Sequence, residues 1–466
     1  MAINLSRNTK VYFTTNVDAD GAVTEASLVA AGTFELQVLD GYSFSQSTTQ
    51  STIQISEAGS TPSRGQRAFN TALNPVDFTF STYVRPYKST YVAPAERVLW
   101  NALLGEATIA ANTGLAITSL TRAAGAATAI LVTATPIQRI VTGTASGVAK
   151  NDVINIHGFT EDSWNDAVVV TGDPVGAGPT TYTVEYSTAP LVGAGTTAAT
   201  TLTTLAYAGQ WAPGTSYSYV TTMGSNKNRL QKFGLIFAVD QVVYAIDNCA
   251  MDQVSIDFGL DAIAMCAWTG KGTTLRKLST TKATLESPTT ATQAVTTAGY
   301  ITNKLSTMTL GSKIGGADAA SSTAYNIPIT GGNITIANNI TYQVPANLAV
   351  VNKPLGYYTG QRAITGNVTA YLRTGGSDDS GTLLTNMLAA GVEPAYKVQL
   401  NMGGASATNR VEFEMPGVVL QIPAVNIADV IATTINFSAQ GFDPNLTNQV
   451  FDITKNNDLT VRYYAA

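Results

Sequence analysis

The side chains best suited to catalysis are scarce in this sequence and lie far apart. His157 is the single histidine, and Cys249 and Cys266 are the two cysteines, among 466 residues. A zinc-protease site needs two histidines at helical spacing, and a mixed His/Cys zinc site needs its ligands clustered. The segment around His157 has no nucleophile-elbow pattern. We therefore predict that the chain is not an enzyme and has no catalytic residue, metal or cofactor.

Three short motifs copy parts of ligand-binding loops without completing them. Residues 16–21 begin like an EF-hand, but Ser27 stands where that loop needs a bidentate glutamate. Residues 269–274 resemble a phosphate loop but lack its first glycine and the Ser/Thr after the lysine. We interpret residues 16–21 as an exposed Asp-Gly turn. We predict that residues 269–274 are not a phosphate loop. The acidic residues 161–166 near His157 indicate a solvated loop, with a weak metal site as the alternative.

Charge and polarity limit the function classes further. Charged residues make up 12% of the chain, about half of the ~25% that is usual, and the net charge is −5. Thr, Ser, Asn, Gly and Ala replace them, and there is no basic stripe for nucleic acid. No apolar run approaches the ~20 residues of a membrane span, and the N-terminus lacks a signal peptide. We expect a protein made in the cytoplasm, with both cysteines as small buried thiols rather than a hairpin disulfide.

Strands dominate the elements that would position any site. Residues 333–342 and 431–437 alternate β-branched with small polar residues, and Ile431, Thr433, Ile435 and Phe437 share one face. Only residues 94–104 and 381–390 have an apolar stripe with helix start and stop signals. We expect a mainly β protein in which each helix lies on a sheet.

An internal repeat appears when these two helices are used as anchors. The motif at 65–68 (GQRA) recurs at 360–363, Tyr83-Val-Arg85 matches Tyr371-Leu-Arg373, and residues 99–103 match 384–388. Residues 41–44 correspond to 332–335. Each half then ends with two more strands, which run through 241–244 to 268–270 and through 417–420 to 438–441. The ordered matches predict one β-rich unit used twice.

The two halves differ by a long segment after the first helix. Residues 106–207 are rich in Ala, Thr, Gly and Val and contain strand-like pieces at 127–133, 167–171 and 181–186. We predict a small immunoglobulin-like β-sandwich inserted at a loop, with a low-complexity loop as the alternative. The expected domains are therefore 1–105 with 208–280, the insertion 106–207, and 281–466.

Several of the duplicated segments resemble one protein family. They are 55–70 (ISEAGSTPSRGQRAFN), 78–87 (FTFSTYVRPY), 98–100 (VLW), 325–332 (YNIPITGG) and 366–372 (GNVTAYL). These segments are similar to the major tail tube protein of long-tailed bacteriophages, of the siphophage type with two fused tube domains. The resemblance covers roughly residues 1–105 and 210–445 and leaves out the insertion.

The resemblance implies two tandem tail-tube β-sandwich or barrel domains that build a conduit. Three chains would form a ring with pseudo-sixfold symmetry, each domain would add four strands to an inner barrel, and stacked rings would form the tube. The implied partners are other copies of the chain, the tape measure protein and then viral DNA in the lumen without specific binding, and the tail terminator and tail tip proteins. The implied location is the virion tail, assembled in the host cytoplasm, without a membrane.

The family also suggests how particular residues act. A wall that lets DNA slide should lack Lys and Arg, so we expect lumen-facing positions to be acidic or uncharged. The repeated Arg67 and Arg362, with Tyr83 and Tyr371, are our candidate assembly residues, and the two arginines are expected in ion pairs. The helices and the insertion should lie outside the barrel, which favours a tail without a contractile sheath.

A second function class stays open at this point. The chain could be a surface adhesion or carbohydrate-binding β-sandwich protein. Trp164, Tyr182, Tyr186 and Trp211 would then supply aromatic contacts, although the more ordinary interpretation is that they belong to a sandwich core.

Overall fold

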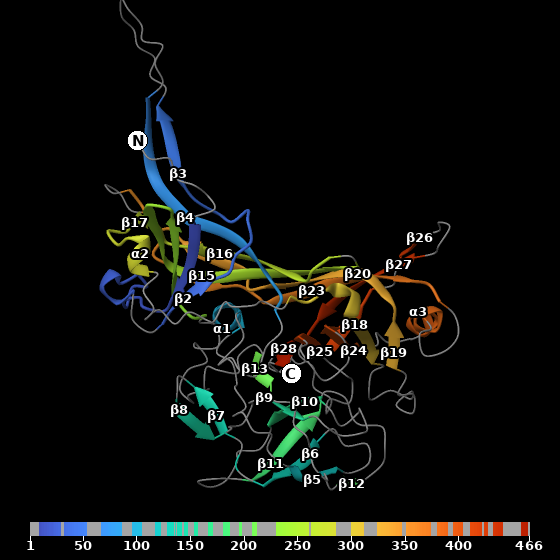
Figure 1. The fold of residues 1–466 in the computed structure, drawn as a ribbon. Helices are drawn as coiled ribbons and strands as arrows, with labels where there is room; N and C mark the ends of the chain where they lie inside the picture. The colour runs from blue at the N-terminus through green and yellow to red at the C-terminus, as the bar shows by residue number, and fades with distance from the viewer. Residues whose placement is uncertain are drawn as a thin grey trace, which may run out of the picture.

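The computed structural model describes the chain in segments that together contain all of its named strands and helices (Figure 1). The described residues are 9–28, 32–53, 67–85, 96–104, 117–122, 128–134, 136, 138–141, 144–147, 153–156, 166–170, 180–186, 195–197, 207–211, 230–260, 262–285, 300–311, 324–346, 351–373, 380–389, 395–403, 411–421, 424–426, 432–440 and 458–464.

Most strands join one large antiparallel sheet system of eighteen strands, as the alternating sequence predicts. The first half of the chain contributes β1 (Thr9–Thr14), β2 (Thr33–Leu36), β3 (Ser43–Ile53), β4 (Arg67–Tyr83), β13 (Tyr207–Trp211), β14 (Phe233–Val239), β15 (Val242–Gly259), β16 (Met265–Gly272) and β17 (Thr274–Lys277). The second half contributes β18 (Thr307–Gly311), β19 (Ala324–Ile327), β20 (Ile329–Ala337), β23 (Ala363–Tyr371), β24 (Ala395–Met402), β25 (Val411–Leu420), β26 (Ala424–Asn426), β27 (Ala432–Ala439) and β28 (Thr460–Tyr464). The fold is therefore mainly β.

The same six strand pairings occur twice along the chain. In the first half, β1 pairs with β2 and β14, β14 with β15, β15 with β16, β16 with β4, and β4 with β3. In the second half, β18 pairs with β19 and β24, β24 with β25, β25 with β27, β27 with β23, and β23 with β20. Each set follows the same chain order, so each of the seven strands in one set has a counterpart in the other.

Nine strands form a continuous inner run of eight strand positions, which we call the inner sheet. Its order is β3, β4, β16, β15, β20, β23, β27 and then β25 with β26. The two halves meet where β15 pairs with β20. Each half therefore supplies four consecutive strand positions to one sheet.

Each half also has an outer sheet that shares a long strand with the inner sheet. Residues 242–249 of β15 pair with β14 and β17, whereas residues 250–259 pair with β16 and β20. A register shift between Met251 and Gln253 marks the bend between the two parts, since an extra residue in one strand kinks it. In β25, residues 411–415, 418 and 419 pair with β24, residues 411–414 also pair with β28, and residues 418–420 pair with β27. The core lies between the outer and inner layers.

Alternation along the strands explains which face of the inner sheet is buried. Val76, Phe78 and Phe80 of β4 are buried, and the intervening Asp77 is exposed. In β27, Thr433, Ile435 and Phe437 are buried, as the period of two predicts.

The expected strand at 333–342 is instead two strands, β20 and β21 (Ile340–Gln343), because the chain turns at Asn339, where φ is 51°. β21 pairs with β22 (Gly356–Thr359).

Both predicted helices are present, with small shifts at their ends. α1 spans Arg97–Leu104 and packs against β15 and β13, with Leu99 and Trp100 fully buried. α3 spans Ser380–Ala389 and contacts β19. The Ser380 hydroxyl accepts a bond from the Arg373 backbone N–H and donates to the Tyr371 carbonyl. A one-turn helix, α2 (Lys282–Leu285), and the 3₁₀ turns Glu25–Ser27 and Asn303–Leu305 complete the helical elements among the described residues.

The described strands between residues 117 and 197 form separate small sheets. Six strands pair in the order β12, β5, β6, β11, β10, β9, and two others form a ladder of their own. Their bounds are β5 (Ile117–Arg122), β6 (Thr128–Thr133), β7 (Gln138–Val141), β8 (Thr144–Gly147), β9 (Val153–Ile156), β10 (Asp166–Val170), β11 (Thr181–Tyr186) and β12 (Gly195–Thr197). Strands therefore occupy this segment as predicted, while the sandwich arrangement and the domain boundaries stay predictions.

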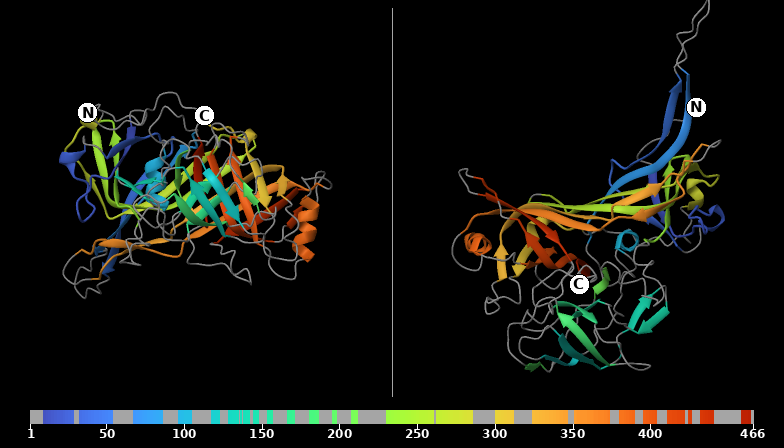
Figure 2. Two further views of the ribbon diagram at one scale, coloured as in Figure 1. Left: turned by 90° about the horizontal axis from the view of Figure 1, so that it is seen from below. Right: turned by 180° about the vertical axis from the view of Figure 1, so that it is seen from behind.

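The inserted strands lie on the side of the inner sheet that carries α1 (Figure 1). β3 and β4 leave the sheet toward the opposite side as a two-stranded ribbon, which we define as residues 47–53 and 67–75. Figure 2, right, shows the same separation from behind. Register shifts between Gln46 and Thr48 and between Thr49 and Gln50 lie where the ribbon begins to bend away.

The structure corrects the register of three repeat matches. Gly41 corresponds to Gly331 rather than Gly332, because Phe44 faces Phe78 and Ile334 faces Gly366 at the equivalent place. The closing strands are the predicted ones, but Val242 corresponds to Val411 and Trp268 to Ile435. The two GQRA motifs begin strands of different length, β4 with 17 residues and β23 with 9. Short local identity does not fix register, because the equivalent strands differ in length and in the positions of their bulges.

Several motif interpretations are confirmed locally. Asp18 accepts hydrogen bonds from the backbone N–H groups of Asp20 and Ala22, which makes the predicted turn. Residues 269–274 run along β16 and into β17, so they form no phosphate loop. Cys249 and Cys266 are free and buried, and burial raises both thiol pKa values well above the usual range. His157 and residues 161–165 lie outside the described residues.

Candidate assembly surface

The face of the inner sheet opposite the core is lined by small uncharged polar side chains. Antiparallel partners share a face, so the register identifies its members. We call this the polar face; its members are Ser43, Ser45, Asp77, Thr79, Ser81, Tyr83, Gln253, Ser255, Asp257, Met265, Ala267, Thr269, Lys271, Asn333, Thr335, Ala337, Ala363, Thr365, Asn367, Thr369, Tyr371, Thr434, Asn436, Ser438 and Val419. Hydroxyl and amide groups dominate it from both halves of the chain.

Only three members of the polar face carry a charge. Asp77 and Asp257 are negative and Lys271 is positive, so the formal net charge is −1. The Lys271 ammonium lies 3.7 Å from the Asp77 carboxylate, its direct cross-strand partner. This pair is exposed and contributes little to stability, but it neutralises the single cation. The face as a whole offers no cluster of positive charge to a polyanion.

The junction between the two halves is reinforced by side chains on the same face. The Asn333 amide donates to the Ser255 hydroxyl at 2.6 Å and to the Asp257 carboxylate at 2.5 Å. The Thr335 hydroxyl donates to the Asn333 carbonyl oxygen at 3.0 Å. On the core side, the Asn338 amide donates to the Leu103 carbonyl at the end of α1 and to Met251. The β15–β20 junction is therefore joined by backbone pairing and by polar contacts on both faces.

Glycine faces phenylalanine at three places on the core side of the inner sheet. The pairs are Phe78 with Gly270, Phe437 with Gly366, and Phe258 with Gly332. A Cβ at any of these glycines would overlap the opposite ring. Phe78 and Gly366 occupy equivalent positions, five residues before Tyr83 and Tyr371. The phenylalanine ring thus comes from β4 in the first half and from β27 in the second, and it fills the same space in both.

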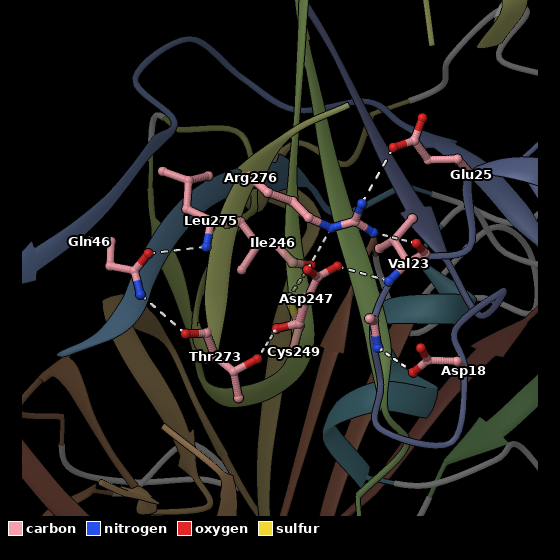
Figure 3. A network of polar contacts seen from close by, with 11 residues as sticks. Asp18, Val23, Glu25, Gln46, Ile246, Asp247, Cys249, Thr273, Leu275 and Arg276 are labelled. Carbon is pink, nitrogen blue, oxygen red and sulfur yellow. Dashed lines mark hydrogen bonds and ion pairs between the residues drawn. The ribbon is translucent and has the colours of Figure 1, made fainter. Parts of the chain in front are cut away.

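A partly buried polar network fixes the base of β3 and the connection between β1 and β2 (Figure 3). Asp247 accepts a bond from the Val23 backbone N–H at 2.8 Å and from Arg276 Nε at 2.7 Å. Arg276 also contacts Glu25 at 3.4 Å and donates to the Val23 carbonyl. In the same view, the Gln46 amide donates to the Thr273 carbonyl and accepts from the Leu275 N–H. β3 is therefore held to β17 by a side chain as well as to β4.

The C-terminal strand β28 joins the core of both halves. It pairs with β25 and with β13, and the buried Tyr463 hydroxyl accepts a 2.8 Å bond from the Trp100 indole of α1. Trp100 packs edge-on against Trp268 at 5.0 Å between ring centroids. Glu96 is buried beside this cluster, and loss of hydration raises its carboxyl pKa to about 7 despite the nearby Arg85. One first-half helix thus depends on the last strand of the chain.

The four predicted assembly residues lie in strands or at strand ends. Arg67 begins β4 opposite Ile53, at the far end of the ribbon. Arg362 precedes β23 and pairs with Asp458 through Nε at 2.9 Å and through Nη2 at 2.6 Å. Tyr83 and Tyr371 end β4 and β23 on the polar face, and Tyr371 is 44% exposed. The two tyrosines hold equivalent positions, whereas the two arginines do not lie together. Their role in assembly stays a prediction.

Residues that the sequence did not single out carry the junction. Asn333, Ser255 and Asp257 belong to strands that are far apart in sequence, so no local motif marks them. Tyr182, a candidate glycan contact, is buried in the small six-stranded sheet, as the core interpretation predicts. Trp164 lies outside the described residues. Over the described segments, neither a cluster of three metal-binding side chains nor a helix able to cross a membrane is found.

Two comparisons with known proteins bear on the role of this chain. No protein-family model matches the chain. The chain is 24% identical over 458 residues to the tail tube protein pb6 of Escherichia phage T5, a match that covers 94% of this chain and 73% of that protein. The mainly β fold and this similarity support a role for the chain as a structural component of a phage tail.

Proposed function

We propose that this chain is a structural tail tube protein in which two fused tube domains stand for two subunits of a ring. Three chains close the inner sheet into a barrel of about 24 strands, with pseudo-sixfold symmetry. The observation that carries this is the inner sheet itself, in which four strand positions from each half succeed one another in the same order. The similarity to pb6 of phage T5 supports the role.

The polar face lines the lumen in this proposal. Proteins bind DNA largely by releasing counterions from phosphates that Lys and Arg neutralise. A wall with a net formal charge of −1 per chain and many hydroxyl groups gives DNA no such partners. The tape measure protein occupies this channel first, and viral DNA then passes through it during ejection without specific binding.

The outer side of the ring carries the inserted strands as decoration. They lie on the side of the inner sheet that bears α1, opposite the polar face (Figure 1). Three such insertions around each ring would obstruct a closely fitting contractile sheath, which favours a siphophage tail. Rings stack through the ribbon of β3 and β4, and the tube ends bind the tail terminator and tail tip proteins.

Ring stoichiometry tests the proposal. Native mass spectrometry of the purified full chain should give trimers and their multiples, and electron microscopy should show rings or tubes with an open centre. A chain that stays monomeric under all assembly conditions and binds glycans through the inserted strands would overturn the proposal and favour an adhesion protein.

A further inference from the structure

The inner sheet ends in two strand edges that have no partner within the described part of the chain. At one end, β3 pairs only with β4, and at the other end β26 pairs only with β27. Open edges of this kind invite pairing with another chain. If one copy pairs with the next through these edges, particular residues of β26 and β3 must face each other.

The junction between β15 and β20 inside the chain shows the register in which two such strands pair. β15 and β20 are antiparallel, with Ser255 opposite Thr335, Ile256 opposite Ile334 and Asp257 opposite Asn333. If the chain is a duplicated unit, then the counterpart of β15 in one copy should meet the counterpart of β20 in the next copy in the same register.

β3 is the counterpart of β20, and its register follows from the strand beside it. Phe44 faces Phe78 of β4, and Ile334 faces Gly366 of β23. Phe78 and Gly366 are equivalent positions, each five residues before the tyrosine that ends its strand. Ser43, Phe44 and Ser45 therefore stand where Asn333, Ile334 and Thr335 stand in the second half.

β26 is the counterpart of the last part of β15. Asn426 faces Ala432 of β27, and Asp257 faces Met265 of β16. Ala432 and Met265 in turn face the equivalent Tyr371 and Tyr83. Ala424, Val425 and Asn426 therefore stand where Ser255, Ile256 and Asp257 stand in the first half.

From these two correspondences we infer the seam between neighbouring chains. β26 of one copy pairs antiparallel with β3 of the next, with Asn426 opposite Ser43, Val425 opposite Phe44 and Ala424 opposite Ser45. Ser43 and Asn426 then stand in the register positions that Asn333 and Asp257 hold at the junction inside the chain. This inference rests on the proposed ring but specifies its register. The occupant of each free edge is a second copy of the same chain.

Disulfide trapping tests the seam. A variant with Ser43→Cys and Asn426→Cys places two thiols at directly opposed positions, where Cα atoms lie about 4.5–5.5 Å apart, within the reach of a disulfide. Oxidation of assembled rings should convert most of the protein into covalent trimers on non-reducing gels. The native thiols of Cys249 and Cys266 are buried and free, so the single-cysteine variants should give no trimers.

The controls separate the register from the ring itself. Ser45→Cys with Ala424→Cys is a second opposed pair and should also give trimers, which covers a failure of the first variant to fold. Ser47→Cys with Asn426→Cys is displaced by about 13 Å along the strand and should not cross-link. Rings that form while both opposed pairs fail, or while the displaced pair links instead, would overturn the seam. Wild-type protein that forms no rings would overturn the proposed function itself.

Discussion

At the scale of single residues, the pairing of glycine with phenylalanine shows how the two halves keep the same packing with different sequences. Phe78 covers Gly270 in the first half, and Phe437 covers Gly366 in the second. An aromatic ring over a strand glycine restores the buried surface that glycine lacks. Either strand can supply the ring as long as the other supplies the space, so a comparison of sequences position by position misses this equivalence.

We therefore predict that Gly270→Ala destabilises the chain by about 1–3 kcal/mol, the range for overpacked cores. The new methyl group would overlap the Phe78 ring and lie 2.6 Å from the Ala250 carbonyl oxygen. Gly356→Ala is the matched control, because nothing lies within 4 Å of a Cβ there. Chemical denaturation should show a loss for the first variant only, and equal stability of the two would contradict this packing.

Glu96 makes stability depend on pH. Its pKa rises from 4.5 in the unfolded chain to about 7 in the folded protein, chiefly because burial removes hydration. The folded state therefore holds the proton more tightly, and the free energy of unfolding should fall as pH rises from about 4.5 to 7, by about 3 kcal/mol. Glu96→Gln should remove this fall, measured by denaturant titration across the range. The exposed Asp20→Asn control should retain it; a Gln variant with the wild-type slope would refute the assignment.

At the scale of elements, the strands that belong to two sheets organise each half. β15 contributes its first part to the outer sheet and its second part to the inner sheet. β25 followed by β26 does the same in the second half. Because one strand spans both layers, the inner sheet cannot move independently of the core. This coupling gives the free edges of β3 and β26 fixed positions.

The ribbon of β3 and β4 projects beyond its backbone contact with Asn352, which bridges to Ala72. Residues 47–52 and 68–70 are exposed, including Phe69 at 50%. An isolated two-stranded ribbon is marginally stable in water, so we expect it to pack against the next ring. Phe69→Ser should leave ring stoichiometry unchanged in native mass spectrometry but shorten tubes in electron micrographs. Leu388→Ser, an apolar change on α3 at a residue that is 62% exposed, should leave tube length unchanged, and shortening by both variants would count against the ribbon.

At the scale of the whole molecule, uncharged polar residues gather on one face of the inner sheet. The polar face gathers hydroxyl and amide groups from both halves and carries only Asp77, Asp257 and Lys271 as charges. The described inserted strands lie on the other side of the inner sheet (Figure 1). This arrangement supports the proposal that DNA passes over the polar face without being held.

We predict that lysines on this face convert the channel into a DNA-binding surface. Tubes that carry Thr269→Lys and Thr365→Lys should retain duplex DNA in co-sedimentation, with binding that weakens steeply as salt rises. Tubes with the same added charge on α3, through Thr385→Lys and Leu388→Lys, should retain less. Equal retention by both variants, or retention by the wild type, would show that the polar face does not line the lumen.

The sequence by itself determined the class of the fold and the absence of a recognisable catalytic constellation. Alternation identified strands such as β27, and capping signals identified α1 and α3 to within three residues, because these signals are local. The repeat was visible from short matches, yet their register was wrong around Gly41 and Trp268, because a match of a few residues does not specify which residues face each other across strands.

Only the tertiary structure decided which residues meet. The contact of Asn333 with Asp257 and the bond from Trp100 to Tyr463 join positions 76 and 363 residues apart. Such partners are chosen by sheet register and by the packing of α1 under β28, which no local pattern encodes. The physical reason is that a strand's sequence specifies which of its faces is buried, whereas its neighbour is selected by the whole set of strands that must share one core.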